Sequence, residues 1–394
     1  MKIALVCPAS LPATQFGGIM HLCIDIAKGI SQMDHDVTIY TTDMDLANNA
    51  HTFNKKLPRI ESVDKFKINR SHVWFYLQLF FINPGMYFQI LKDKPDIIHT
   101  IGVRSFQSFV AALIAKKKKI PLVLTDQGGL TSHPDISDSI IKKLLYRVQF
   151  PMIRFIINQS TMITIGNEYE RKIFSQFCPE SKLVIVRNGV DLEKLQIRAE
   201  SFKAKHNIVT HYILFVGRFA YVKGVDLLVK AFALIQNEQA VLNVKLVIMG
   251  VDFGFESQML KMINELKIAD KIIVIKKPSR DEVLAAYSEC QFLVLPSRWE
   301  LSPLTPLEGF AFRKPTISTT AHGIPFTITD GDNAILVEPD NAEYLAKAIL
   351  HLITDEKTRT KYGESGYRLV HDVCNSKTMA QNILQVYKNI LRES

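Results

Sequence analysis

The chain has 394 residues, of which 47% are hydrophobic and 22% charged, which excludes a disordered or fibrous protein. At roughly 150 residues per domain, such a length indicates two or three domains. The 48 Lys and Arg residues outnumber the 39 Asp and Glu residues, and the resulting formal net charge of +9 favours an anionic partner. Nucleotide phosphates, nucleic acid and an anionic membrane face all fit this charge.

The five cysteines are scattered and form no CxxC pair, which argues against a disulfide framework and a structural zinc site. We predict buried free thiols at Cys7 and Cys23 and a cytoplasmic protein. The apolar run over residues 3–7 is too short for the core of a signal peptide. Asn83-Pro84-Gly85 interrupts the most apolar stretch, residues 73–91, before either half reaches the ~20 residues of a spanning helix.

In the first half of the chain, short apolar runs alternate with helical patterns. Residues 3–7 are predicted as a buried strand, and apolar residues recur at helical spacing from Ile19 to Ile30. Further strands are predicted at residues 37–40, 96–100, 122–125, 162–165 and 183–186. Strands separated by segments of helix length indicate βαβ units and a parallel sheet.

A second series of this kind follows a polar stretch over residues 193–211, which we predict to be the linker. Its strands are predicted at residues 212–216, 245–249, 272–275, 292–295, 316–318 and 335–337, and Ser279 to Glu282 forms a capping-box pattern. We therefore expect α/β domains over residues 1–200 and 201–375, and a terminal helix over 376–394 that crosses back to the N-terminal domain. Two doubly wound halves would bind a ligand in the cleft between them, at the carboxyl ends of their strands.

Two segments of the second half carry residues suited to a nucleotide. Gly217-Arg218 ends a predicted strand and Lys223-Gly224 opens the next helix. Arginine offers a planar fork of donors and lysine a point charge, and both suit a diphosphate, as does a helix N-terminus. The alternative is an ordinary solvated turn.

The other segment contains Glu300 and Glu308, with seven residues between them. A carboxylate accepts two hydrogen bonds, which matches the cis hydroxyls of a ribose. The amides of residues 302–305 would lie at a helix start and suit phosphate. A solvated helix face is the alternative for the glutamates, and loop packing is the alternative for Arg298, Trp299 and Glu300.

Taken in order along the chain, these segments resemble family 4 of the retaining glycosyltransferases. The motifs that carry the resemblance are Gly17-Gly18, Arg187-Asn188-Gly189-Val190-Asp191, Gly217-Arg218, Lys223-Gly224, Pro296-Ser297 with Glu300-x7-Glu308, Lys314-Pro315-Thr316-Ile317, Gly323-Ile324-Pro325 and residues 330–337. The resemblance covers roughly residues 1–390, and the ordered set is more specific than any single motif.

The resemblance implies the GT-B fold, in which two Rossmann-like doubly wound parallel-sheet domains face a cleft. It implies that the N-terminal domain binds the acceptor and the C-terminal domain binds a UDP- or GDP-sugar donor, with no cofactor and no obligatory metal. Retention of the anomeric configuration is implied as well.

By the same resemblance, Arg218 and Lys223 bind the diphosphate and stabilise the leaving nucleotide, while Glu300 lies near the hydroxyls of the donor sugar and Glu308 holds the ribose. The donor phosphate is the expected base, so no protein nucleophile is assigned. The further donor-binding residues are Gly17, Gly18, Gly217, Ser302, Pro303, Leu304 and Thr305.

The first half departs from the family pattern where histidines are frequent, because Ile101 and Gln127 occupy those positions. Contacts with the sugar or the acceptor are expected at His99, Asp126, Gln127 and Asn188. A structural role at the end of a strand is the alternative for His99. Leu301 also replaces the glycine that is usual after the first glutamate, which leaves the donor sugar unassigned.

Residues 72–91 are rich in aromatic side chains, and basic residues gather at Lys142, Lys143, Arg147 and Arg154. Together they have the composition of a surface that contacts an anionic membrane at its inner face. The alternative is a buried helix pair with a solvated basic face, and we expect Pro151 to interrupt a single helix at this point.

These observations favour a nucleotide-sugar-dependent hexosyltransferase acting on a glycan, glycolipid or lipid-linked acceptor. A sugar-nucleotide epimerase or hydrolase and an inactive nucleotide-sugar-binding module are the alternatives. A nicotinamide dehydrogenase is disfavoured because no GxGxxG follows the first strand. Nucleic-acid binding has only the net charge in its favour, and we expect none.

Overall fold

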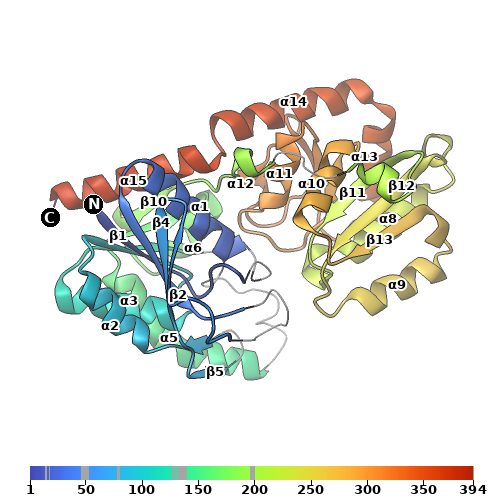
Figure 1. Ribbon diagram of the computed structural model, residues 1–394. Coiled ribbons are helices and arrows are strands. Elements are labelled where there is room, and N and C mark those ends of the chain that lie inside the picture. The colour runs from blue at the N-terminus through green and yellow to red at the C-terminus, as the bar shows by residue number, and fades with distance from the viewer. Residues whose placement is uncertain are drawn as a thin grey trace. The chain divides into compact units, whose positions relative to one another are not determined.

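The computed structural model describes residues 1–13, 16, 18–45, 53–77, 80–126, 128, 130, 140–195 and 200–393, without the side chains of 140–146 and 393 (Figure 1). The predictions for Gly17 and Gln127 lie outside the described residues, as do those for the side chains of Lys142 and Lys143. The chain divides into a first unit, Met1–Asn188 with Ser376–Ser394, and a second unit, Gly189–Asn375.

The first unit is built on an eight-stranded sheet of order β10-β9-β8-β7-β1-β2-β4-β3. Its strands are β1 (Lys2–Val6), β2 (Asp36–Thr42), β3 (Ile60–Val63), β4 (Phe66–Ser71), β7 (Ile97–Ile101), β8 (Leu122–Thr125), β9 (Met162–Ile165) and β10 (Leu183–Ile185). Neighbouring strands are parallel except at the edge, where β3 pairs with β4 in the antiparallel sense. A separate antiparallel pair is formed by β5 (Phe75–Leu77) and β6 (Phe80–Ile82).

Helices cover both faces of this sheet because successive residues of a strand point to opposite sides. Ile3 and Leu5 pack in the layer of α1 and α15, while Ala4 and Val6 pack in the layer of α2, α3 and α5 (Figure 1). The helices are α1 (Gly18–Gln32), α2 (Gly85–Asp93), α3 (Phe106–Lys118), α5 (Ile140–Gln159), α6 (Glu168–Phe174) and α15 (Ser376–Glu393). The terminal helix α15 thus belongs to the first unit, whose sheet is doubly wound.

Two features of the first unit differ from the sequence prediction. Within residues 72–91, β5 and β6 pair as antiparallel strands and α2 follows them, so the alternative of a buried helix pair was wrong. Pro151 lies inside the continuous helix α5 and does not interrupt it. An internal proline costs ~3 kcal/mol, but Ile153, Ile156 and Ile157 are fully buried and their burial offsets that cost.

The second unit has a six-stranded parallel sheet of order β13-β12-β11-β14-β15-β16. Its strands are β11 (His211–Val216), β12 (Val244–Gly250), β13 (Ile272–Lys276), β14 (Leu293–Leu295), β15 (Thr316–Thr319) and β16 (Ala334–Val337). Its α-helices are α7 (Phe202–Lys205), α8 (Val225–Ile235), α9 (Glu256–Glu265), α10 (Arg280–Glu289), α11 (Leu304–Ala311), α12 (Ile324–Thr327), α13 (Ala342–Thr354) and α14 (Glu356–Asp372).

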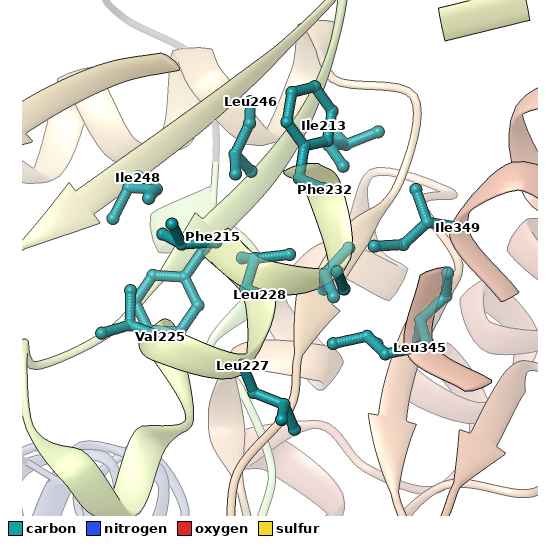
Figure 2. Packing of buried hydrophobic residues seen from close by; sticks show 14 of the residues in the cluster. Ile213, Phe215, Val225, Leu227, Leu228, Phe232, Leu246, Ile248, Leu345 and Ile349 are labelled. Atoms are coloured by element: carbon teal, nitrogen blue, oxygen red, sulfur yellow. The ribbon is translucent and has the colours of Figure 1, made fainter. Parts of the chain in front are cut away.

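The side chains on the two faces of β11 pack into two different layers of the core. Ile213 and Phe215 pack with β12, α8 and α13, and Figure 2 shows the side chains of these elements meeting. Tyr212 and Leu214 pack in the opposite layer with residues of α10 and α11. The second sheet is therefore also doubly wound, as predicted. The capping pattern holds too, because the Ser279 hydroxyl accepts a hydrogen bond from the Glu282 amide at 3.2 Å.

The boundary between the units lies at Asn188–Gly189, earlier in the chain than the polar stretch predicted as the linker. Part of that stretch belongs to the second core, where Leu195, Phe202 and Ile208 are buried. Polar composition misled the prediction because these buried residues are spaced widely among exposed ones.

The predicted buried thiols are confirmed: Cys7 and Cys23 are buried and neither is in a disulfide. Within the described ranges, the structure contains no helix with the length and apolar character needed to cross a membrane.

Candidate active site

The predicted nucleotide residues of the second unit gather where the strand order of its sheet reverses. Strands β11 and β14 are neighbours, with β12 and β13 on one side and β15 and β16 on the other. The chain leaves β11 toward residues 217–224 and leaves β14 toward residues 296–303. Such a switch point, at the carboxyl ends of parallel strands, is where open α/β sheets bind ligands.

Glycines allow the loops after these strands to touch. Gly224 has φ +67°, and a Cβ at this position would lie 1.9 Å from the carbonyl oxygen of Pro296. A Cβ at Gly323, in the loop after β15, would lie 1.8 Å from the carbonyl oxygen of Leu301. Any larger residue at either position would force the loops apart, so three loops are locked into one surface.

Arg298 fastens the loop after β14 to the start of α8. Its guanidinium donates to both carboxylate oxygens of Asp226 at 2.7 and 2.8 Å, and to the carbonyl oxygen of Tyr221 at 2.7 Å. It also lies 3.9 Å from the centroid of the Tyr221 ring and bonds Asp340 at 2.5 Å. These contacts favour the alternative reading of Arg298 as a loop-packing residue.

Lys223 and Glu300 meet although 77 positions separate them. The Lys223 ammonium donates to Glu300 Oε1, and the Ser297 hydroxyl donates to the same oxygen at 3.3 Å. Their side chains are only 16% and 12% exposed, so the pair is partly withdrawn from water. The structure therefore places Lys223, predicted to bind the diphosphate, in contact with Glu300, predicted to lie near the donor sugar.

Arg218 is exposed, and its guanidinium lies 4.9 Å from the centroid of the Phe253 ring. Within the described part of the chain, Arg218 forms no ion pair. It consequently presents a positive charge that an incoming anion can bind. The residue before Arg218 is packed closely against β12. A Cβ at Gly250 would lie 1.8 Å from the carbonyl oxygen of Gly217.

Glu308 lies on α11 and is held by two residues of α10. Arg280 donates to Glu308 Oε1 at 2.7 Å, and the Tyr287 hydroxyl donates to Oε2 at 2.9 Å. Burial and the neighbouring carboxylate raise the pKa of Tyr287 well above its ordinary value, so its hydroxyl remains a donor. Each carboxylate oxygen can accept a second hydrogen bond, which leaves Glu308 able to accept ribose hydroxyls.

The helix α11 begins next to this carboxylate, at Leu304. Its N-cap is Pro303, which makes no side-chain cap. The amides of Leu304 and Thr305 have no acceptor within the helix because of their position in its first turn. This end of α11 therefore offers N–H groups and the positive end of a helix dipole to a phosphate. Ser302 is half-buried just before it.

Tyr287 and Arg280 were not predicted as site residues. Both precede Glu308 by a strand and a loop, and only the folded packing of α10 against α11 brings them to it. No local motif marks them, apart from the capping pattern that places Arg280 at the first position of α10.

In the first unit, the structure corrects the prediction for His99. His99 is fully buried, and its Nδ1 and Nε2 lie 2.5 Å from the Tyr387 hydroxyl and 2.7 Å from the Thr125 hydroxyl. Burial lowers the pKa of His99 to about 3, so the ring stays neutral. Both ring nitrogens are occupied, and His99 ties α15 to the sheet instead of contacting a sugar.

Asp126 is likewise buried, and its carboxylate accepts the amides of Val103 at 3.1 Å and Leu130 at 3.0 Å. It stabilises the loops after β7 and β8, and a contact of Asp126 with a ligand stays a prediction. Asn188 is buried at the end of the first unit. A Cβ at Gly18 would meet no atom of the described residues within 4 Å, so their packing does not demand glycine there. Ligand contacts of Asn188 and Gly18 stay predictions.

Comparison with known proteins finds similarity to glycosyltransferases along nearly the whole chain. The family model described as Glycosyltransferase Family 4 matches residues 16–194, and the model described as Glycosyl transferases group 1 matches residues 196–369. An uncharacterised glycosyltransferase of Methanocaldococcus jannaschii is 28% identical over 284 residues, which is 70% of this chain and 71% of that protein.

A relative that matches over its full length is the N-acetyl-alpha-D-glucosaminyl L-malate synthase of Bacillus anthracis. It is 23% identical to this chain, and the alignment covers 100% of this chain and 98% of that protein. Among solved structures, Anabaena HepE in complex with UDP-glucose superposes with a TM-score of 0.74 at 16% identity, over 99% of this chain and 100% of that one. The two family models, the doubly wound units and these neighbours agree, and the chain belongs to glycosyltransferase family 4 with the GT-B fold.

Proposed function

We propose that the protein transfers a hexosyl group from a UDP- or GDP-sugar to a hydroxyl of a glycan, glycolipid or lipid-linked acceptor, with retention of configuration. The observation that carries this proposal is the convergence of Arg218, Lys223 and Glu300 at the switch point of the second sheet. The UDP-glucose bound to Anabaena HepE and the glycosyl group in the name of the Bacillus anthracis relative support it.

In this mechanism, positive charge meets the negative charge that develops on the departing diphosphate. Arg218 supplies a guanidinium exposed to the ligand, and Lys223 supplies an ammonium whose direction is set by Glu300. Fixed charges of this kind stabilise a transition state without having to reorganise. The first amides of α11 add to the same field. We propose that no metal is required, because these groups provide the positive charge.

Glu300 has a second role toward the donor sugar. Its Oε1 is engaged by Lys223 and Ser297, while its Oε2 is the oxygen assigned to a sugar hydroxyl. The leaving phosphate takes the proton of the acceptor hydroxyl, so no side chain serves as nucleophile. A sugar-nucleotide epimerase or hydrolase on the same fold is the alternative, and incubating the donor without an acceptor separates the two. An epimerase isomerises the sugar, whereas a transferase leaves the donor intact apart from slow hydrolysis.

Nucleotide binding tests the donor site directly. Replacing Glu308 by alanine is expected to raise the Kd for UDP or GDP by about tenfold or more, because hydrogen bonds to a charged group contribute roughly 1.5–3 kcal/mol. Isothermal titration calorimetry measures this Kd. Tyr287→Phe should weaken nucleotide binding by only a few fold, because it removes one of the two hydrogen bonds that hold the Glu308 carboxylate.

The matched control is Glu265→Ala, which removes an exposed glutamate of α9 that pairs with Lys261. Its Kd should equal that of the wild type. If Glu308→Ala binds the nucleotide as tightly as the control, the ribose role of Glu308 is wrong.

We also propose that the hairpin β5–β6 and α2 contact an anionic membrane surface. Trp74, Phe75 and Leu77 are 75%, 59% and 53% exposed, and Phe88 of α2 is 70% exposed. Exposed lysines end α3 beside them, where Lys117 donates to the Tyr87 hydroxyl at 3.1 Å. An apolar patch flanked by lysines is typical of a surface that binds anionic lipid.

Sedimentation with phosphatidylglycerol vesicles tests this contact. The variant Trp74→Ser/Phe75→Ser should lose most of the bound fraction, because two large apolar side chains leave the lipid interface. Val209→Ser removes an apolar residue that is 95% exposed in the second unit and should bind as the wild type does. Equal sedimentation of both variants, or equal binding to uncharged phosphatidylcholine vesicles, would contradict the proposal.

A further inference from the structure

Arg218 and Phe253 follow two neighbouring strands at the same edge of the second sheet. Arg218 comes after β11 and Phe253 after β12, and these strands pair in parallel over residues 211–216 of β11. The guanidinium of Arg218 lies over the face of the Phe253 ring, 4.9 Å from its centroid. The ring is 55% exposed, so the two side chains meet at the surface. Phe253 belongs to none of the motifs that carry the family resemblance.

Hydrogen bonds between the two loops continue the pairing of β11 and β12 beyond the strand ends. The amide of Phe219 donates to the carbonyl oxygen of Val251 at 2.8 Å. The amide of Phe253 donates in turn to the carbonyl oxygen of Phe219 at 3.0 Å. The backbone of Phe253 is therefore tied to the residue that directly follows Arg218.

The turn that carries Phe253 is also held by the carboxylate of Asp252. Its Oδ1 accepts the amides of Gly254, Phe255 and Glu256 at 2.9, 3.0 and 3.0 Å, at the start of α9. These hydrogen bonds, that of Glu256 first, lower the pKa of Asp252, so the carboxylate stays charged and keeps its donors. Phe253 thus lies between a bond to the neighbouring loop and a helix cap, which fixes the base of its ring.

The two cations of the donor site are held in different ways. The Lys223 ammonium is paired with Glu300, which orients it and neutralises part of its charge. Among the residues that the structure describes, no carboxylate pairs with Arg218, and its guanidinium lies over a ring instead. An aromatic face attracts a guanidinium through its quadrupole and uses none of the N–H donors, which lie in the plane of the group.

We propose that Phe253 is a positioning residue of the donor site: its ring holds the guanidinium of Arg218 in one orientation and leaves the N–H donors to the oxygens of the diphosphate. An arginine side chain loses rotamer entropy when a ligand orders it, and a contact that orders it beforehand removes this cost. That the ligand is a diphosphate rests on the proposed function. The ordering of Arg218 in the free protein does not, so it is measured separately.

The first measurement is NMR relaxation of the Arg218 Nε–H bond in the ligand-free, full-length protein, with Arg218→Lys identifying the signal. The order parameter should be lower in Phe253→Ala than in the wild type, because the guanidinium loses its partner. Phe253→Leu keeps apolar bulk without an aromatic face and should resemble Phe253→Ala. Phe253→Tyr keeps the face and should resemble the wild type.

The matched control is Tyr344→Ala on α13. Tyr344 is 53% exposed, and Lys347 Nζ lies over its ring at 5.5 Å from the centroid, so this variant also removes an exposed aromatic partner of a cation. It should leave Arg218 as ordered as in the wild type.

The second measurement is turnover with a UDP- or GDP-sugar. Phe253→Ala should lower kcat/KM by about three- to tenfold, the factor that corresponds to the loss of a cation–π contact. In the Arg218→Ala background, Phe253→Ala should have no further effect, because the two residues act as a unit. Tyr344→Ala should keep the wild-type value.

An equal order parameter in the wild type and Phe253→Ala, or an order parameter of Phe253→Leu equal to that of the wild type, would overturn the proposal. So would an equal loss of kcat/KM from Phe253→Ala with and without Arg218. If the wild type transfers no sugar from either donor, the proposed function is contradicted, and the order parameters still decide whether Phe253 orders Arg218.

Discussion

Replacing Arg218 and Lys223 together by alanine is expected to remove most of the turnover while the protein stays folded. Removing one preorganised donor from a developing charge typically lowers kcat by a factor on the order of 10²–10³. The two residues serve the same diphosphate, so the double variant should lose less than the product of the single losses. Steady-state kinetics with a UDP- or GDP-sugar gives the kcat values, and thermal unfolding verifies the fold.

The fold should survive because neither side chain carries much of the core. Arg218 is exposed, and its guanidinium lies against the exposed ring of Phe253. Removing Lys223 costs some stability because Glu300 loses its cation, but the carboxylate keeps the Ser297 hydroxyl as a partner, and the assay is run below the unfolding transition of the variant. A drop in melting temperature large enough to explain the lost activity would therefore be unexpected.

A matched control for the lost charge is Lys230→Ala/Lys261→Ala, at exposed positions of α8 and α9. Its kcat should stay near the wild-type value, since surface charges outside the site act weakly through salt-screened water. Arg218→Lys separates charge from geometry, because lysine keeps the charge and loses the planar fork. If the Arg218/Lys223 double variant turns over as fast as the control, leaving-group stabilisation by this pair is refuted.

The sequence was sufficient to predict that Lys223 and Glu300 lie in one place, because both follow strand ends in motifs of fixed spacing. Their binding roles stay predictions. The parallel sheet carries each strand end to the same edge, so Lys223 and Glu300 had to approach each other once β11 and β14 paired. Tyr287 illustrates the limit. Its contact with Glu308 depends on how α10 packs against α11, which no local pattern of charge or hydrophobicity encodes.

His99 shows a second limit. Its position at a strand end fitted both a ligand contact and a core role, and the choice depends on Tyr387, 288 residues away. The C-terminal helix supplies the partner that makes the core role possible. Strand β4 of the same sheet escaped prediction for a related reason. Lys67 and Arg70 interrupt its apolar pattern, and Arg70 is tolerated inside because Glu61 and two carbonyl oxygens bind it.

The contact between Arg298 and Asp226 holds the loop after β14 against the start of α8, which follows Lys223. Both side chains are largely buried, with 11% and 8% of their surface exposed, and the bond is bidentate. Asp226 lies in the first turn of α8, and Arg298 also holds the carbonyl oxygen of Tyr221, two residues before Lys223. The pair thus fixes the loop of Lys223 against the loop of Glu300.

Arg298→Ala should therefore lower the free energy of unfolding by about 3–5 kcal/mol, because removing one partner of a buried pair leaves the other charge uncompensated. Replacing both, as Arg298→Met/Asp226→Leu, should restore part of this loss. Denaturation by urea measures the change. Arg313→Ala is the control, since Arg313 pairs with Glu364 and lies 3.6 Å from the centroid of the Tyr367 ring at the surface. Each of these exposed contacts contributes about 1 kcal/mol or less.

The same variant should bind the nucleotide more weakly even below its unfolding transition, because a loosened loop no longer presents Lys223 in one direction. The Kd for UDP should rise in Arg298→Ala and stay unchanged in Arg313→Ala, in calorimetry at a temperature where both are folded. Equal unfolding free energies for the two variants would show that the Asp226 contact does not stabilise the second unit. A stability loss with unchanged nucleotide affinity would show that the contact supports the fold but not the site.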